Sequence, residues 1–219
     1  QGSKVFKTIA LAGKNKELSG YILSLAENKT QGIDLAITLR GINEISLYES
    51  IIRGTSSRIK QALSIDSLSL EVFSKILPLI PGKPLLNSIN IEDQNRAVQL
   101  LRLAKQHGTA VVLLSLGSNG PAKTLEDKLA LAQSLYTLAK ENSIRDEEIF
   151  FDVCTFPLIS TGKESMQAVL DAIRSLKAMY PETGTILGVG NISYGLAKHM
   201  RLPVTAYFYK KAVQAGLDA

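Results

Sequence analysis

The sequence predicts an α/β protein of the (β/α)₈ TIM-barrel class, in which the barrel is either complete or lacks its last unit. Three observations support this fold class. Short apolar runs with strand character alternate with amphipathic helical segments at intervals of about 25 to 40 residues. Polar residues follow several of these runs, where the active sites of such barrels lie. The turn after the first run, Ala12-Gly13-Lys14-Asn15, lacks the glycine-rich dinucleotide pattern that an open doubly wound sheet would usually show.

Seven segments are predicted as strands because each is a short apolar or β-branched run bounded by turn residues. They are Val5–Leu11, Ile33–Leu39, Ala62–Ile65, Pro84–Asn87, Thr109–Leu116, Ile149–Val153 and Thr185–Val189. The continuous apolar run from Thr109 is typical of a strand buried on both faces. An eighth strand is expected to begin at Leu217. Because helices separate the strands, the pairing is expected to be parallel.

Seven segments are predicted as helices from the spacing of their apolar residues and from their capping residues. They are Asn15–Asn28, Glu44–Gly54, Ser69–Leu77, Asp93–His107, Thr124–Asn142, Lys163–Tyr180 and Pro203–Ala215. Ser69 and Thr124 are expected to cap their helices, and Asp127 replaces the usual Glu or Gln of a capping box. Gly108 and Gly216 are expected to end two of the helices.

The composition is that of a globular protein, with 45% hydrophobic and 21% charged residues in a chain of 219. We expect one domain over residues 4–219, preceded by an expression-tag remnant at Gln1–Ser3. No apolar run approaches the roughly 18 residues of a membrane span. The single cysteine, Cys154, excludes an internal disulfide framework. These features predict a cytoplasmic protein that has no membrane partner.

The net charge of +5 and a pI of about 9.2 raise the question of nucleic-acid binding. The basic residues are scattered and the chain has no tryptophan, so no nucleic-acid partner is expected. A basic surface can instead attract an anionic small ligand or an acidic protein. Because only His107, His199 and Cys154 offer nitrogen or sulfur ligands, no metal site is expected.

Four of the predicted strand ends carry a carboxylate or a carboxamide: Asp66, Asn87, Asp152 and Asn191. Such residues are common in turns, so each alone has an equally good structural explanation. Together, at the carboxyl-terminal mouth of one barrel, they would bind a flat heterocycle such as an amino-pteridine. A carboxylate accepts from an amino group and an adjacent ring N–H, while a carboxamide both donates and accepts. The absence of lysine or histidine from these strand ends argues against a Schiff-base aldolase.

Two features near these residues have ordinary structural interpretations. Cys154 follows Asp152 by two residues but has no base partner, so we interpret it as a partly buried thiol. The segment Gly117–Pro121 is interpreted as an ordinary loop between strand and helix, with a lid as the alternative.

Several segments occur in an order and spacing that resemble the pterin-binding methyltransferases. These are the methyltetrahydrofolate:corrinoid/iron–sulfur protein methyltransferases and the folate-binding domains of cobalamin-dependent methionine synthases. The resemblance covers Ser57 to Ala219 and rests on the sequences IDSLSLEVFSKIL, GKPLLNSIN, HGTAVVLLSL, EEIFFDVCTFPL, TILGVGNISYGL and FYKKAVQAGLDA. Each motif is short, but the ordered set is specific.

The resemblance implies a barrel that binds methyltetrahydrofolate and transfers its methyl group from pterin nitrogen 5 to the cobalt of a corrinoid. The corrinoid would be carried on a partner protein or domain, and the chain would form a homodimer, with Thr124–Asn142 and Lys163–Tyr180 as candidate surfaces. By position, Asp66, Asn87 and Asp152 match the residues that hold the pterin. Asn191 matches the catalytic asparagine that hydrogen-bonds near nitrogen 5. Cobalt is the nucleophile, so no covalent protein nucleophile is required.

The first quarter of the chain departs from this family. Its first strand usually reads like GERIN, where this chain has TIALAGK, and its second usually ends in D-x-N, where ITLRG places Ile37 and Leu39. The chain also stops where the eighth strand begins, so a fragment of a longer protein is one alternative. Another is a non-catalytic barrel that binds a pterin or a corrinoid partner. A dihydropteroate synthase is a third, although VCTFPLIST after Asp152 lacks the glycine-rich, lysine-containing loop of that enzyme.

Overall fold

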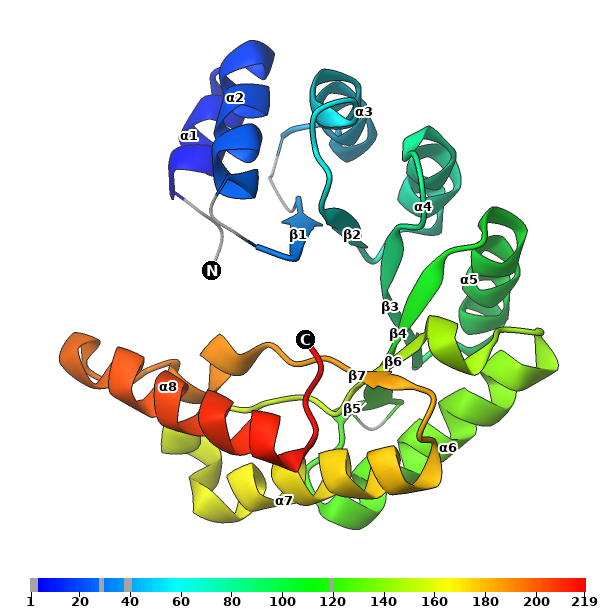
Figure 1. Ribbon diagram of the computed structural model, residues 1–219, viewed down its shortest axis with the longest axis vertical. Helices are drawn as coiled ribbons and strands as arrows, with labels where there is room; N and C mark the ends of the chain where they lie inside the picture. The colour runs from blue at the N-terminus through cyan, green and yellow to red at the C-terminus, as the bar shows by residue number, and fades with distance from the viewer. Residues whose placement is uncertain (1–3, 28–29, 38–40, 119) are drawn as a thin grey trace. The chain divides into compact units, whose positions relative to one another are not determined.

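The computed structural model describes residues 4–27, 30–37, 41–118 and 120–219. These fall into two compact units, one of residues 1–88 and 102–110 and the other of residues 89–101 and 111–219. Strand β3 (Leu85–Ile91) and helix α5 (Gln94–His107) contribute residues to both units. In each unit, parallel strands alternate with helices along the chain, as the sequence predicts (Figure 1).

The first unit carries the blue to green elements of Figure 1. They are α1 (Lys4–Leu11), α2 (Asn15–Ala26), β1 (Gly32–Ala36), α3 (Glu44–Thr55), β2 (Ala62–Asp66), α4 (Leu70–Ile76), the 3₁₀ helix η1 (Leu77–Leu79) and the start of β3. Strand β2 pairs in parallel with β1 and with β3. Helices α2, α3 and α4 are successive neighbours beside these strands (Figure 1). Side chains of β1 alternate between buried Ile33 and Leu35 and exposed Asp34 and Ala36, so one face of the strand is apolar.

The prediction of a strand at Val5–Leu11 is wrong, because Lys4–Leu11 forms helix α1. The apolar residues Val5, Phe6, Ile9 and Ala10 recur with helical spacing and gather on one side of the helix. A short apolar run does not distinguish a strand from a helix by composition. Within the described residues, six strands rather than seven therefore form parallel pairs.

The second unit continues the alternation. Its elements are β4 (Ala110–Gly117), β5 (Gly120–Pro121), α6 (Leu125–Glu141), η2 (Asp146–Glu148), β6 (Ile149–Asp152), α7 (Leu158–Met179), β7 (Gly184–Thr185), η3 (Val189–Ser193) and α8 (Lys198–Ala215). Strand β6 lies between β4 and β7 and is parallel to both, while β5 pairs antiparallel with the end of β4. Helix α7 contacts both α6 and α8 (Figure 1).

Most helix ends follow the predicted capping residues. The Ser69 hydroxyl accepts a hydrogen bond from the Val72 N–H at 3.2 Å, and the Thr124 hydroxyl accepts one from Asp127 at 3.1 Å. Gly108 and Gly216, with φ of 62° and 110°, follow the helices that they were predicted to end. These residues therefore mark one end each of α4, α6, α5 and α8, as predicted.

Two boundaries in the second unit differ from the prediction. The predicted strand from Thr185 is short, since β7 ends at that residue and Val189 already begins η3. Helix α8 begins at Lys198 and contains Pro203, which the sequence placed at its first position. The continuous part of α7 starts near Lys163 as predicted, because Gly162 interrupts the helix with a φ of 72°.

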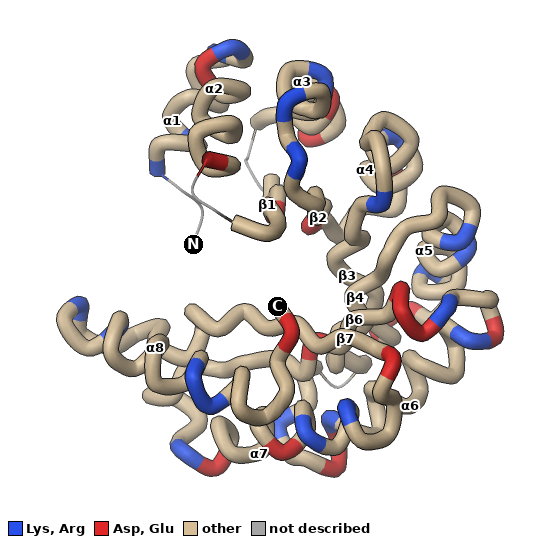
Figure 2. The backbone as a smooth tube through the Cα atoms, viewed as in Figure 1, with Lys and Arg blue, Asp and Glu red and all other residues tan. Residues whose placement is uncertain are grey.

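Among the described helices, α6 and α7 carry charges of both signs, whereas α1, α5 and α8 carry Lys and Arg but no Asp or Glu (Figure 2). None of the helices in the described ranges is long and apolar enough to cross a membrane.

Candidate functional site

Three polar side chains from the neighbouring strands β1, β2 and β3 lie together in the first unit. Asp66 ends β2, and Asn87 lies opposite it on β3. The Asn87 amide Nδ2 donates to Oδ1 of Asp34 on β1 at 3.4 Å. Asp34 lies opposite Ser64, and Ala36 lies opposite Asp66, so Asp34 and Asp66 share a face of the sheet. We call Asp34, Asp66 and Asn87 the Asp66 cluster.

The Asp66 cluster holds a carboxyl group that titrates close to neutrality. Burial raises the pKa of Asp66 from 3.8 to about 6, and the nearby Asp34 carboxylate adds to the rise. At pH 7 a carboxyl with such a pKa is mostly ionised and accepts hydrogen bonds, while the Asn87 carboxamide can donate as well as accept. The cluster can therefore offer both kinds of hydrogen bond to a heterocycle.

Tyr48 fixes the strand ends that carry this cluster. Its hydroxyl oxygen lies 2.8 Å from the carbonyl oxygen of Leu35 and 2.9 Å from that of Asp66, which share its single proton, and it accepts from the Ile37 N–H at 3.2 Å. The side chain is fully buried on α3, and burial raises the pKa of the phenol, which keeps the hydroxyl protonated. One side chain thus links the end of β1 to the end of β2.

The sequence predicts Ile37 and Leu39 at the D-x-N positions of the second family strand. Ile37 has a buried side chain, and Leu39 lies outside the described residues. The carboxylate that β1 contributes to the cluster is Asp34. The alternation in GIDLAI carried the missed signal, because a period of two puts Asp34 and Ala36 on the face opposite Ile33, Leu35 and Ile37.

In the second unit, Asp152 ends β6 and is held by the loop that follows. Its Oδ1 accepts a hydrogen bond from the Cys154 N–H at 2.8 Å. Burial raises the pKa of Asp152 from 3.8 to about 6, although the Cys154 hydrogen bond and the charge of Lys128 oppose the rise. Asp152 is therefore mostly ionised at pH 7 and is an acceptor for a donor-rich ligand.

Lys128 is a residue of this region that the sequence analysis missed. It is fully buried on α6, and its Nζ donates to the carbonyls of Ala122, Val153 and Cys154. The missed signal is its spacing, because Lys128, Ala132, Leu135 and Ala139 recur on the buried side of α6. A lysine at such a position needs acceptors in the interior.

Asn191 lies on η3 after β7, and its side chain is exposed. Its N–H donates to the Gly188 carbonyl at 3.0 Å, and its own carbonyl accepts from the Tyr194 N–H at 3.1 Å. A Cβ added at Gly188 would lie 2.8 Å from the Asn191 Nδ2. The carboxamide therefore lies against Gly188, and the absence of a side chain there provides its space.

Cys154 has the properties of the partly buried thiol that the sequence predicts. Burial, with a contribution from the Asp152 charge, raises the pKa of Cys154 to about 12. The thiol is therefore protonated at neutral pH and is a poor nucleophile. Among the residues that the structure describes, no group of three or more His, Cys, Asp or Glu side chains could hold a metal ion.

The four predicted site residues thus divide between the units. Asp66 and Asn87 are adjacent in the first, and Asp152 and Asn191 belong to the second. Asp66 and Asp152 end their strands, whereas β3 continues past Asn87, and Asn191 lies in η3, beyond the end of β7 at Thr185. That all four bind one ligand stays a prediction.

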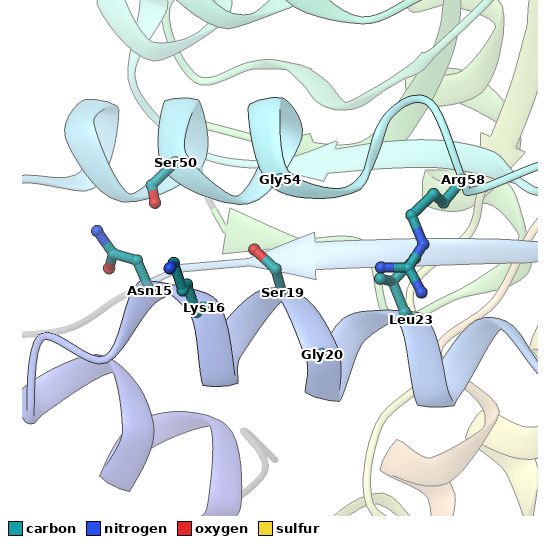
Figure 3. A pocket seen from close by; sticks show the side chains of 8 residues that line it. All are labelled: Asn15, Lys16, Ser19, Gly20, Leu23, Ser50, Gly54 and Arg58. Carbon is teal, nitrogen blue, oxygen red and sulfur yellow. The ribbon is translucent and has the colours of Figure 1, made fainter.

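A separate hollow of about 410 Å³ lies between α2 and α3 (Figure 3). Lys16 and Arg58 are among its lining residues, and none of the predicted site residues lines it. Gly54 of α3 and Ser19 of α2 both line the hollow. The two helices approach each other closely there, because a Cβ added at Gly54 would overlap the Ser19 hydroxyl.

Comparison with known proteins connects this chain to pterin chemistry. The sequence profile of a family described as pterin binding enzyme matches residues 36–219. Methionine synthase of Mycobacterium leprae is 30% identical over 231 residues, which include 100% of this chain and 19% of that protein. Methionine synthase of Mycobacterium tuberculosis is 28% identical with the same coverage. The chain thus spans about a fifth of the length of these curated relatives.

Solved structures show the same fold at low sequence identity. The dihydropteroate synthase of Stenotrophomonas maltophilia has a TM-score of 0.71 and 15% identity, with 93% of this chain and 80% of that chain covered. The dihydropteroate synthase of Xanthomonas albilineans has a TM-score of 0.68 and 15% identity, with 93% and 77% covered. These likenesses confirm the predicted barrel fold class.

Proposed function

Because the chain belongs to the family of pterin binding enzymes, we propose that it binds methyltetrahydrofolate and passes the methyl group to the cobalt of a corrinoid. The methyl group would leave nitrogen 5 of the pterin, and a partner protein or domain would carry the corrinoid. Family membership confirms the resemblance drawn from the sequence. The relatives named methionine synthase, matched along the whole chain, favour methyl transfer over dihydropteroate synthesis, since the likeness to dihydropteroate synthases shows the fold alone.

The observation that carries the pterin proposal is made in each unit separately: a carboxyl group, Asp66 or Asp152, ends a strand there. Both Asp66 and Asp152 have a pKa of about 6, so each can serve as an acceptor at neutral pH. Among the described residues, Asp152 has a hydrogen-bond partner on Oδ1, which leaves Oδ2 for the ligand. A pterin amino group and its adjacent ring N–H form the donor pair that such a carboxylate accepts. Asn87 adds a carboxamide beside Asp66.

Asn191 is proposed as the catalytic residue. An amine nitrogen leaves readily only when it is protonated or strongly hydrogen-bonded, so a donor that strengthens its bond in the transition state lowers the barrier. The exposed carboxamide of Asn191 can supply that bond without titrating. The corrinoid supplies the cobalt nucleophile, and the residues of this chain bind and orient the pterin.

We also propose that the chain forms a homodimer and acts in the cytoplasm. The predicted surfaces on α6 and α7 expose few large apolar side chains, namely Ile159 and Met179. Helix α8 instead exposes Leu202 by 78%, Tyr209 by 53% and Val213 by 48%, at a spacing that places them along one side. This stripe supports pairing with a second copy, which sedimentation of the wild type and of Leu202→Glu would test.

One observation favours a second candidate function, a pterin-binding module without turnover. The segment expected to form the first strand is helix α1, and the first quarter of the chain departs from the family pattern. Such a barrel could keep its pterin contacts and lose the corrinoid-side surface.

Titration calorimetry with methyltetrahydrofolate tests the proposal. Asp152→Ala is expected to weaken binding by about 1.5–3 kcal/mol, the usual worth of a hydrogen bond to a charged group. Asp171→Ala, which removes an exposed carboxylate on α7, is the matched control and is expected to bind normally. Absence of binding by the wild type would refute the proposal. Binding without methyl transfer to cob(I)alamin would favour the second candidate.

A further inference from the structure

Lys128 is a buried cation whose ammonium group donates three hydrogen bonds, all to main-chain carbonyls. An ammonium has three N–H donors, and the acceptors are Ala122 at 2.8 Å, Val153 and Cys154 at 3.1 Å. The ring of Phe156 lies 5.2 Å from Nζ and adds a cation–π contact. An apolar side chain of similar volume would fill the same place without the cost of burying a charge. The position therefore suggests a role beyond packing.

Two of the carbonyls that Lys128 binds, those of Val153 and Cys154, belong to the loop that follows Asp152. Cys154 has a φ of 57°, in the left-handed region that a side chain other than glycine rarely adopts. With this conformation, the Cys154 N–H turns back to Oδ1 of Asp152 at 2.8 Å. Lys128 holds the carbonyls of both loop residues, so it stabilises the turn that fixes the orientation of the Asp152 carboxylate.

Lys128 also acts on Asp152 through its charge. Its ammonium opposes the effect of burial on the Asp152 pKa, and burial in turn lowers the pKa of Lys128. The Cys154 thiol is protonated, and the strands beside β6, namely β4 and β7, contain no titratable side chain. Lys128 is thus the cation that acts on Asp152 in the described part of this unit.

We propose that Lys128 is a positioning residue for Asp152, which it orients through the loop and keeps ionised for the donors of the pterin. The part that concerns the pterin rests on the proposed function. The orientation and ionisation of Asp152 can be measured without any ligand.

Three variants separate charge from hydrogen bonding. Lys128→Gln keeps N–H donors but removes the charge, and Lys128→Met removes both. Lys140→Gln, on the exposed side of the same helix, is the matched control. The readouts are the pKa of the Asp152 carboxyl, from its carbon-13 NMR signal, and methyltetrahydrofolate affinity between pH 6 and 8.5.

In Lys128→Gln, the Asp152 pKa is expected to rise, and folate affinity is expected to fall several-fold at pH 7 and to recover at pH 8.5. In Lys128→Met, affinity is expected to fall about tenfold or more at pH 7 with incomplete recovery, because the loop also loses its anchor. Lys140→Gln should match the wild type. An unchanged Asp152 pKa in folded Lys128→Gln would overturn the proposal.

The wild type provides a test even if neither variant folds. An Asp152 carboxyl that stays protonated at pH 7, or a Cys154 amide that exchanges as fast as an exposed loop amide, would contradict the proposal. An Asp152 carboxyl that is ionised at pH 7, with a protected Cys154 amide, would support it. If the wild type binds no folate, the proposed function fails, whereas the Asp152 measurements still decide the role of Lys128.

Discussion

The hydroxyl of Tyr48 donates a hydrogen bond to the main-chain carbonyl of Asp66 at 2.9 Å, which ties helix α3 to the carboxyl end of β2. The same oxygen contacts the carbonyl of Leu35 and the N–H of Ile37 at the end of β1. The two strand ends therefore depend on one buried phenol for their relative position. Replacing Tyr48 therefore tests how strongly the Asp66 cluster depends on this support, although Tyr48 itself is not expected to contact a ligand.

Tyr48→Phe is expected to lower the free energy of unfolding by about 1–3 kcal/mol, because it leaves buried main-chain groups without their partner. Urea denaturation measures the change. Tyr136→Phe is the control, since the Tyr136 hydroxyl bonds the carboxylate of Asp146 in a partly exposed position and its loss should cost less. Equal losses in the two variants would show that the Tyr48 hydroxyl has no special role at the strand ends.

Asp66 is expected to make the folded chain more stable as the pH falls from 7 to 4. Its pKa of about 6 lies above the ordinary 3.8, so between these values the folded state binds more protons than the unfolded state. Asp66→Asn removes the cost of ionisation and should stabilise the protein at pH 7, by on the order of 1 kcal/mol. Urea denaturation at pH 4.5 and 7 measures both effects.

Asp34→Asn is the companion variant for this titration. It removes the carboxylate whose charge helps to raise the Asp66 pKa. The pH dependence of the free energy of unfolding should therefore become smaller without disappearing. If Asp66→Asn destabilised the protein equally at both pH values, the Asp66 carboxyl would have a structural role instead.

Gly54→Ala is expected to destabilise the protein by about 1–3 kcal/mol, although alanine normally favours a helix interior. The new Cβ would overlap the Ser19 hydroxyl where α3 meets α2. The exchange Ser19→Gly with Gly54→Ala removes the obstructing side chain and should restore most of the loss, as thermal unfolding would show. A stabilised single variant would mean that the helices can separate at no cost.

The sequence predicted the fold class correctly, but it predicted a strand where the first element is a helix. Six of the seven expected strands exist because each combines an apolar run with turn residues, and the caps at Ser69 and Thr124 mark helix starts unambiguously. The run from Val5 is too short for its period to be decisive, and it forms helix α1. Local pattern could not settle that choice.

The places of three candidate site residues along their strands were predictable from the sequence. Asp66, Asn87 and Asp152 were found as polar residues at or near the ends of apolar runs. Lys128 was not found, because its role depends on carbonyls 25 and 26 residues away in the chain, which no local pattern reveals. Asp34 was missed for a different reason: the strand was compared with a family motif, and the alternation of apolar and polar residues along it was not used.

Asn191 is expected to contribute more to the rate of methyl transfer than to the affinity for methyltetrahydrofolate. If its carboxamide stabilises the departing nitrogen, Asn191→Ala should lower methyl transfer to cob(I)alamin by about 10²–10³ at saturating methyltetrahydrofolate. Folate affinity should fall less, since Asp66, Asn87 and Asp152 remain. Single-turnover absorbance measurements of cob(I)alamin, with calorimetry for binding, separate the two effects.

Gly188→Ala provides an independent variant of the same contact. Its new Cβ would lie 2.8 Å from the Asn191 Nδ2, so the carboxamide must move while its chemistry is kept. A rate loss like that of Asn191→Ala, at similar folate affinity, would show that the placement of the carboxamide limits the transfer. Weak binding with normal turnover at saturation in both variants would instead make Asn191 a residue of uniform binding, which holds substrate and transition state equally.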